Sequence, residues 1–305
     1  MKYRVEQGDC LDVLRGMSES SVDLVFCSPP YEAARTYGIG FSLKGQDWVD
    51  WAVERFTECC RVSRGLVAWV VEGQTRRFQW SATPALMMAD LHRAGIKLRK
   101  PPVFHRVGIP GSGGPDWWRN DYEFVVCASD GRLPWSDNTA VGKPCRHQPG
   151  GQPSHRTKSG DRVGKMRASV TEPKALAFLN GEMPLGSKLH TKNNGDGMRV
   201  QCYVPPVVAN PGNVVQCVVG GGRMGSRLAH ENEAPFPEKL AEAFILSFCP
   251  PGGVVLDPFC GSGTTLAVAV KHGRDAIGID VRESQVDLSE RRIDEARKCS
   301  QGKAR

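Results

Sequence analysis

The stretch that decides the fold is Asp257-Pro258-Phe259-Cys260-Gly261-Ser262-Gly263-Thr264-Thr265, residues 257–265 of the chain. An apolar segment rich in β-branched residues, 254–259, leads into it, and a helical pattern, 264–272, follows it. Gly261 and Gly263 permit a tight turn that a ligand can approach closely, and the amides that open the helix offer unpaired donors. The pattern therefore predicts a strand, a glycine turn and a helix that together hold a polar or anionic ligand.

A second predicted strand, 276–280, ends at Asp280, about 15 residues after the glycine turn. A carboxylate in this position can hold the hydroxyls of a ribose. The glycine spacing differs from the GxGxxG of dinucleotide enzymes, and the chain has no GKT or GKS sequence, which argues against a P-loop. A GxG turn alone is often structural. Nucleoside binding is favoured here because the turn follows a strand and is itself followed by a helix, a second strand and an acidic residue, in that order.

A second motif, Ser28-Pro29-Pro30-Tyr31, ends the apolar strand predicted at 22–27. Its prolines forbid further ladder hydrogen bonds and stiffen the turn. Ligands gather at the carboxyl ends of strands in a doubly wound sheet, so both motifs are expected at one edge. The Ser28 hydroxyl and the Pro29 carbonyl are then free to accept hydrogen bonds, and Tyr31 offers a flat face to a base. A rigid strand exit with a capping serine would explain this turn alone.

Strand and helix patterns alternate at both ends of the chain and predict a doubly wound, mostly parallel α/β sheet. The expected strands are 3–7, 22–27, 66–71, 97–107, 122–128, 254–259 and 276–280, and the expected helices are 48–60, 84–94, 237–248, 264–272 and 284–298. We predict seven strands with a terminal hairpin, and a central strand at 254–259 beside 22–27.

The middle of the chain, 133–229, is rich in Gly, Pro, Asn and basic residues and has no clear periodicity. We interpret it as a loop-rich insertion between two halves of one domain, 1–132 and 230–305. The net charge of the 305 residues is +7, but 141–230 holds 13 Lys/Arg and 4 Asp/Glu, a local net of +9. This bias predicts a polyanionic partner for the insertion, although a basic, solvated loop is the alternative.

The 11 cysteines form no pair of CxxC units, and Cys145, His147 and His155 fit no standard zinc spacing, so no metal is expected. An odd number of cysteines scattered along the chain favours a reduced, intracellular compartment. Residues 1–10 lack the apolar core of a signal peptide, and no apolar run reaches 18 residues. We therefore expect a soluble, cytoplasmic protein.

The two motifs in this order resemble those of the β-class amino-methyltransferases of DNA. That family places a [DNS]-P-P-[YFW] motif first, then a target-recognition region, then a DPF-x-GSGT cofactor motif. Gly8-Asp9-Cys10 resembles the family's early acidic turn, and His230 with the sequence PFPEKL at 235–240 resembles the segment before the cofactor strand. The resemblance covers about 1–130 and 230–305 and leaves out the middle.

The resemblance implies a circularly reordered Rossmann-like methyltransferase sheet, S-adenosyl-L-methionine as cofactor, and methylation of an exocyclic base nitrogen after base flipping. The implied catalytic residues are Ser28, Pro29, Pro30 and Tyr31. The implied cofactor site comprises Asp9, Cys10, His230, Asp257, Phe259, Gly261, Gly263, Thr264 and Asp280. The implied partners are double-stranded DNA and a cognate restriction endonuclease, with the chain as a monomer or homodimer.

Contacts with DNA are expected from the basic insertion and from the loop after Tyr31. The candidate residues are Arg35, Tyr37, Arg156, Lys158, Arg162, Lys165 and Arg167. Residues 35–37 also suit a plain surface loop, and Trp117-Trp118-Arg119 suits base stacking or, with preference, packing on the sheet. His230 is expected to contact the cofactor carboxylate, although it could instead cap the next helix.

Serine at position 28 favours the N4 of cytosine as the methylated atom, because the family's adenine enzymes mostly carry Asp or Asn there. Acceptors at Ser28 and the Pro29 carbonyl would bond the amine hydrogens and favour a tetrahedral nitrogen. Adenine N6 methylation is the alternative; an RNA or protein N-methyltransferase and a silent DNA-binding protein are further ones. Carbon-5 methylation needs a cysteine nucleophile, and Pro144-Cys145 lies out of motif order.

Overall fold

The computed structural model describes residues 1–33, 37–108, 114–144, 155–156, 162–163, 188–192, 199–203, 207–220 and 224–302. The chain divides into two compact units, one formed by Met1–Ala140 with Gly212–Arg305 and the other by Val141–Pro211. The first unit joins both ends of the chain and contains both motifs.

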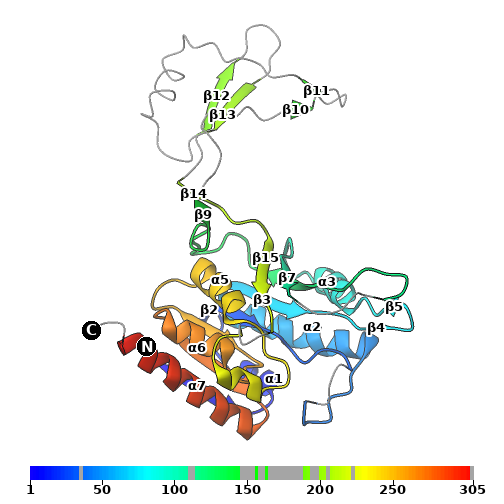
Figure 1. The fold of residues 1–305 in the computed structure, drawn as a ribbon, viewed down its shortest axis with the longest axis vertical. Helices are drawn as coiled ribbons and strands as arrows, with labels where there is room; N and C mark the ends of the chain where they lie inside the picture. Colours follow the sequence, from blue (N-terminus) through cyan, green and yellow to red (C-terminus); the bar gives the residue numbers. More distant parts are fainter. Residues whose placement is uncertain are drawn as a thin grey trace. The chain divides into compact units, whose positions relative to one another are not determined.

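A nine-stranded sheet forms the centre of the first unit within the described residues, in the order β1-β17-β16-β2-β3-β8-β7-β15, with β6 beside β8 (Figure 1). Five neighbouring strands are parallel: β1 (Tyr3–Gln7), β17 (Asp275–Asp280), β16 (Val254–Asp257), β2 (Val22–Cys27) and β3 (Ser63–Val71). The order then continues through β8 (Tyr122–Ala128), which is antiparallel to both of its neighbours, β3 and β7 (Val103–Val107). Strand β15 (Val214–Val218) pairs parallel with β7 at the edge, and β6 (Leu98–Arg99) pairs with β8 off the path.

The predicted junction between the two ends of the chain is confirmed, because β16 pairs with β2 through Val255 opposite Leu24 and Leu256 opposite Val25. The mostly parallel doubly wound fold is confirmed as well, with β7 and β8 as the hairpin. The count of seven strands is too low. Pro101 and Pro102 separate β6 from β7 within the segment predicted as one strand, and β15 adds a further strand.

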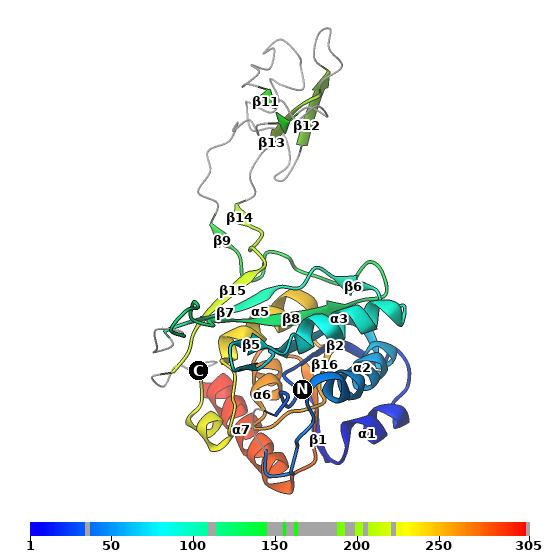
Figure 2. The same cartoon turned by 90° about the vertical axis from the view of Figure 1, so that its right-hand side faces the viewer.

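Helices cover both faces of the sheet (Figure 2). One face carries α1 (Cys10–Gly16), α2 (Gly45–Val62) and α3 (Thr83–Arg93), and the other carries α5 (Glu238–Phe248), α6 (Thr264–Lys271) and α7 (Glu283–Gly302). Strand β3 alternates between two apolar clusters: Leu66, Ala68 and Val70 pack toward α5 and α6, and the residues between them pack toward α2. This alternation is why the strand reads as a continuous apolar run.

The second unit contains three short antiparallel pairs among its described residues: β9 (Lys143–Pro144) with β14 (Val208–Ala209), β10 (His155–Arg156) with β11 (Arg162–Val163), and β12 (Lys188–Lys192) with β13 (Arg199–Tyr203). Its limits, Val141–Pro211, are narrower than the insertion of 133–229 expected from composition, because 133–140 and 212–229 belong to the first unit. Arg156 pairs with Arg162 in register. The candidate DNA contacts Arg35, Lys158, Lys165 and Arg167 lie outside the described residues.

Two further features concern the residues that the structure describes. No helix among the described residues is long and apolar enough to cross a membrane. Eight cysteines in the described parts of the chain carry free thiols.

Candidate active site

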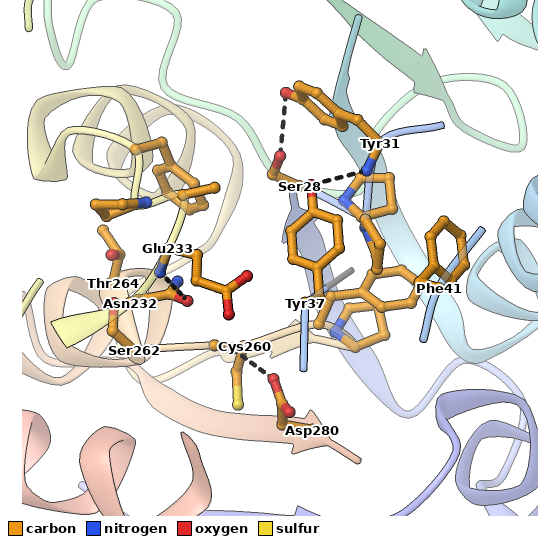
Figure 3. Close-up of a pocket in the computed structure, with 18 of the residues that line it drawn as sticks. Ser28, Tyr31, Tyr37, Phe41, Asn232, Glu233, Cys260, Ser262, Thr264 and Asp280 are labelled. Atoms are coloured by element: carbon orange, nitrogen blue, oxygen red, sulfur yellow. Dashed lines mark hydrogen bonds between the residues drawn. The ribbon is translucent and has the colours of Figure 1, made fainter. Parts of the chain in front are cut away.

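Both motifs line one cavity of about 970 Å³ in the first unit. The carboxyl ends of parallel β2, β16 and β17 meet at this edge, and antiparallel β8 begins there. Most of the predicted site residues lie on its wall: Asp9, Cys10, Ser28, Pro29, Pro30, Tyr31, Tyr37, His230, Phe259, Gly261, Thr264 and Asp280. Figure 3 shows Ser28 and Tyr31 on one side of this space and Cys260, Ser262 and Asp280 on the other.

The Ser28–Tyr31 turn is anchored by hydrogen bonds from neighbouring elements. The indole nitrogen of Trp48 in α2 donates to the Pro30 carbonyl at 2.8 Å, and the Tyr31 amide donates to the Tyr37 hydroxyl at 3.1 Å. The next residue, Glu32, is buried, and its carboxylate accepts from the amides of Gly45 and Gln74 and from Thr83 Oγ1. These contacts hold the turn in one conformation before any substrate binds.

Ser28 and Tyr31 are joined through their hydroxyls. The Ser28 hydroxyl donates to the Tyr31 hydroxyl at 3.2 Å, and the latter donates to Glu123 Oε2 at 2.7 Å. Burial, with the neighbouring Glu123 charge, raises the pKa of Tyr31 well above its usual value, so the phenol keeps its proton. No hydrogen bond from another described residue reaches the Pro29 carbonyl, and its role as an acceptor for a substrate stays a prediction.

At the other end of the cavity, Asp280 connects the glycine turn at Gly261 with the backbone that follows β17. Its carboxylate accepts from the Gly261 amide at 3.0 Å and from the Arg282 amide at 2.9 Å. Oδ1 also accepts from Arg282 Nε at 3.4 Å, whereas among the described residues Oδ2 accepts from the Gly261 amide alone and keeps a lone pair for a ligand hydroxyl. Its expected role toward a ribose stays a prediction.

Asp9 lies at the N-terminus of α1, where its carboxylate accepts from the Leu11 amide at 2.8 Å and caps the helix. Arg55 from α2 pairs with both oxygens of Asp9 at 3.1 and 3.2 Å, and its guanidinium lies 4.7 Å from the centre of the Trp51 ring. The pair fixes the direction of the Asp9 carboxylate beside an aromatic surface.

A chain of aromatic rings covers the same side of the cavity. Tyr37 contacts Phe41 at 6.3 Å between centroids, Phe41 contacts Trp51 at 5.1 Å, and Trp51 contacts Phe259 at 5.6 Å. Flat apolar rings beside two carboxylates, Asp9 and Asp280, suit a nucleoside, which has a planar base and a hydroxylated sugar. The residues present therefore fit the nucleoside part of S-adenosyl-L-methionine.

Two residues of the glycine motif lie outside the wall of the cavity. Gly263 has a φ of +74°, and a Cβ there would lie 2.9 Å from the Cα of Ser289, so α7 packs directly on the turn. Asp257 is buried and accepts from the Phe259 amide at 3.0 Å. Both residues shape the turn from behind, and neither forms part of the cavity wall.

Asp257→Asn is expected to gain stability relative to the wild type by about 2–3 kcal/mol between pH 5 and pH 8. Burial raises the pKa of the Asp257 carboxyl to about 7, whereas the unfolded chain titrates near 4. The native protein therefore holds a proton that the unfolded chain has lost, and wild-type stability falls as pH rises through this window. Urea unfolding of both proteins at four pH values measures the difference, and a difference independent of pH would contradict it.

Several cavity residues escaped the sequence analysis: Phe41, Trp51, Arg55, Glu123, Asn232 and Glu233. The preference for packing Trp117 and Trp118 on the sheet was wrong, because the two residues are 78% and 88% exposed. Their ring centroids lie 6.2 Å apart. Large exposed rings are available to a partner.

The fold and the cavity together define an α/β protein in which a Ser-Pro-Pro-Tyr turn and a glycine turn lie at one edge of the sheet, with a lining that suits a nucleoside. A family model described as DNA methylase, of the N6/N4 type, matches residues 22–291. The chain belongs to this family of DNA methyltransferases, and the resemblance found from the two motifs is confirmed.

Individual relatives agree with this assignment. The chain is 26% identical to the DNA adenine methyltransferase YhdJ of Escherichia coli (strain K12) over 95% of this chain and 82% of that protein. The fold is similar to that of the PvuII DNA methyltransferase (cytosine-N4-specific), with a TM-score of 0.63, 18% identity and coverage of 99% and 92%. It is also similar to that of a DNA modification methylase from Thermus thermophilus complexed with S-adenosyl-L-methionine, with a TM-score of 0.53, 19% identity and coverage of 97% and 96%.

Proposed function

We propose that this DNA methyltransferase transfers a methyl group from S-adenosyl-L-methionine to the N4 of cytosine in duplex DNA. The observation that carries the proposal is Ser28 at the cavity wall, with its hydroxyl hydrogen directed to Tyr31. Serine in this motif position is typical of the N4-cytosine members of the family.

The cofactor would lie against the glycine turn, with Asp280 and Asp9 toward its ribose and adenine and the rings of Trp51 and Phe259 along the base. S-adenosyl-L-methionine supplies an electrophilic methyl group on a sulfonium when it is bound. Asp280 and the Gly261 amide hold this end of the cavity in shape, because they are hydrogen-bonded to each other at 3.0 Å. We infer that Asp257 and Gly263 contribute through the shape of the turn.

The Ser28 turn would receive the target base. An exocyclic amine is a weak nucleophile because its lone pair is delocalised into the ring. The Ser28 oxygen and the Pro29 carbonyl accept its hydrogens and so favour a tetrahedral nitrogen with a localised lone pair. A paired base cannot reach this cavity, so the base must leave the helix, and Tyr31 and Tyr37 present rings to it.

The duplex would be held by basic residues of the second unit and by the rim of the cavity. Arg156 and Arg162 pair across β10 and β11, which places two arginines opposite each other in a short antiparallel pair of strands. Arginines bind phosphates through paired hydrogen bonds and release counterions. The exposed Trp117 and Trp118 could stack on bases beside the extruded nucleotide.

Adenine N6 is the second candidate, because YhdJ, a relative over 95% of this chain, is a DNA adenine methyltransferase. Adenine and cytosine both present an exocyclic amine, so the same acceptors would serve either base. The chemistry of the turn is the same in both cases, and the shape of the pocket beyond Ser28 would set the choice.

One experiment tests the substrate class and the target atom together. Tritiated methyl transfer to duplex DNA, RNA and protein is compared, and the methylated DNA is digested to nucleosides for mass spectrometry. We expect incorporation into duplex DNA and N4-methylcytosine as the product. N6-methyladenine as the sole product would overturn the target atom and leave the mechanism intact, whereas incorporation into RNA or protein alone would overturn DNA as the substrate.

A further inference from the structure

Glu123 is a buried carboxylate near the start of β8, 8% exposed and followed by the mostly apolar residues 124–128. A charge in this position is costly unless it is paired. Arg106 of β7 contacts Glu123 Oε1 at 3.1 Å, and the Tyr31 hydroxyl donates to Glu123 Oε2 at 2.7 Å. Each carboxylate oxygen thus has its own partner, and one of the two partners belongs to the Ser28–Tyr31 turn.

The direction of these hydrogen bonds follows from the number of protons. Tyr31 has one hydroxyl hydrogen, and the Glu123 carboxylate can only accept, so this hydrogen lies between Tyr31 and Glu123. The Tyr31 oxygen can then only accept from Ser28, at 3.2 Å. The Ser28 hydrogen is therefore directed away from the substrate, and its oxygen lone pairs stay available to the cavity. Such a chain of hydrogen bonds is also mutually reinforcing.

We propose that Glu123 is a positioning residue for methyl transfer, which acts through the Tyr31 hydroxyl to hold the Ser28 oxygen as an acceptor for the target amine. This inference rests on the proposed function, since it requires an amine substrate at Ser28. It assigns a role to a residue that neither motif contains. Glu123 touches neither the base nor the cofactor in this scheme, and its effect passes entirely through two hydroxyl groups.

Protonation of Glu123 would reverse the direction of the hydrogen bonds that link Glu123, Tyr31 and Ser28. A neutral Glu123 donates to Tyr31, Tyr31 then donates to Ser28, and the Ser28 hydrogen turns toward the cavity, where it opposes an amine donor. Besides the neutral Tyr31, two charged groups face Glu123. Arg106 from β7 favours the carboxylate, and Glu72, the residue after β3, has a carboxylate that accepts from the Gly73 amide and from Trp80 Nε1. Burial raises the pKa of Glu123, and the Arg106 charge lowers it. Turnover should therefore fall on the acid side as Glu123 is protonated.

A purely structural role for Glu123 predicts a different result for the variants. The Glu123–Arg106 pair joins β8 to β7 and could simply support this edge of the sheet. Removing Glu123 would then lower activity whether or not Tyr31 has a hydroxyl. The two roles are separated by changing both residues together.

The test is a double-mutant cycle on the turnover number with Tyr31→Phe and Glu123→Gln. Tyr31→Phe keeps the ring and removes the link, whereas Glu123→Gln keeps the size and presents an amide hydrogen to Tyr31, because Arg106 attracts the amide oxygen. We expect each variant to lower kcat about 10- to 100-fold, the cost of a hydrogen bond to a charged group. The double variant should be no slower than the slower single variant, with KM for DNA and cofactor affinity nearly unchanged.

The matched control is Tyr122→Phe, which also removes a phenol hydroxyl. Tyr122 precedes Glu123 in the sequence, is half-exposed and does not line the cavity. It should leave kcat unchanged. Losses that multiply in the double variant, or single variants with wild-type kcat, would overturn the inference. The acid limb of the wild-type kcat profile should be absent in Tyr31→Phe, and an unchanged limb would also count against the inference.

A second cycle avoids any variant that disturbs the Glu123–Arg106 pair. Tyr31→Phe introduced into the Ser28→Ala protein should cause no further loss of kcat, since the hydroxyl it would orient is gone. A further tenfold loss would overturn the inference. Failure of the proposed function is recognised separately, because the wild-type protein would then transfer no methyl group to DNA. If the wild type is active but the losses of kcat in the variants are independent, the positioning role alone is rejected.

Discussion

Ser28→Ala is expected to lower the turnover number about 100- to 1,000-fold, the range found when one preorganised hydrogen-bond partner of a transition state is removed. The Ser28 oxygen is one of two acceptors for the target amine, and its hydrogen bond to Tyr31 sets its direction before substrate binds. Cofactor affinity should change less than about twofold, because Asp280 and the Gly261 turn at the other end of the cavity keep their mutual hydrogen bond. Single-turnover methyl transfer and calorimetry measure the two quantities.

The control for this change is Ser21→Ala, immediately before β2, the strand that Ser28 follows. The Ser21 hydroxyl is buried without a hydrogen-bond partner among the described residues, so its removal deletes the same group far along the strand from the cavity. It should leave both turnover and cofactor affinity at wild-type values. Equal losses of turnover and cofactor affinity in Ser28→Ala would mean that Ser28 supports the fold and has no direct part in the chemistry.

The sequence predicted the centre of the parallel sheet well, because β2 and most of β3 are buried on both faces and read as apolar runs. Residues 22–27 and 3–7 form β2 and β1 with the predicted bounds, and α2 buries the predicted face that includes Trp48, Phe56 and Cys59. Strand β15 was not predicted, because only Cys217 of its five residues is buried and no alternation marks it as part of the sheet. Its place depends on pairing with β7, about 110 residues earlier in the chain.

The two ends of the site were predicted from local motifs, whereas the residues between them were not. Trp51 fits the apolar face of α2, and its position beside Phe259 follows only from how the helix packs on the sheet. Glu123 is the instructive case, because a carboxylate inside an apolar strand was visible in the sequence. Its position at the cavity required knowing that β8 runs antiparallel to β3, which places its first residues at the carboxyl edge of the other strands.

Asp280→Ala is expected to weaken S-adenosyl-L-methionine binding about 10- to 100-fold, which corresponds to losing a hydrogen bond to a charged group. The side chain performs two tasks that the variant would lose together. It would accept from the ribose, and it holds the Gly261 and Arg282 amides at 3.0 and 2.9 Å, so the shape of the turn depends on it. Turnover at saturating cofactor should fall less than about threefold, because Ser28 and Tyr31 are untouched.

Two further variants serve as comparisons for Asp280→Ala: one changes a carboxylate elsewhere on β17, and the other keeps part of the Asp280 side chain. Asp275→Ala removes the same side chain from the opposite end of β17, where it accepts from the Lys2 amide at 2.6 Å, and it should leave cofactor affinity unchanged. Asp280→Asn keeps one carbonyl oxygen and the volume of the side chain, so it should bind the cofactor more tightly than Asp280→Ala but less tightly than the wild type. Calorimetry on the three variants gives the comparison, and wild-type affinity in Asp280→Ala would remove this carboxylate from the cofactor site.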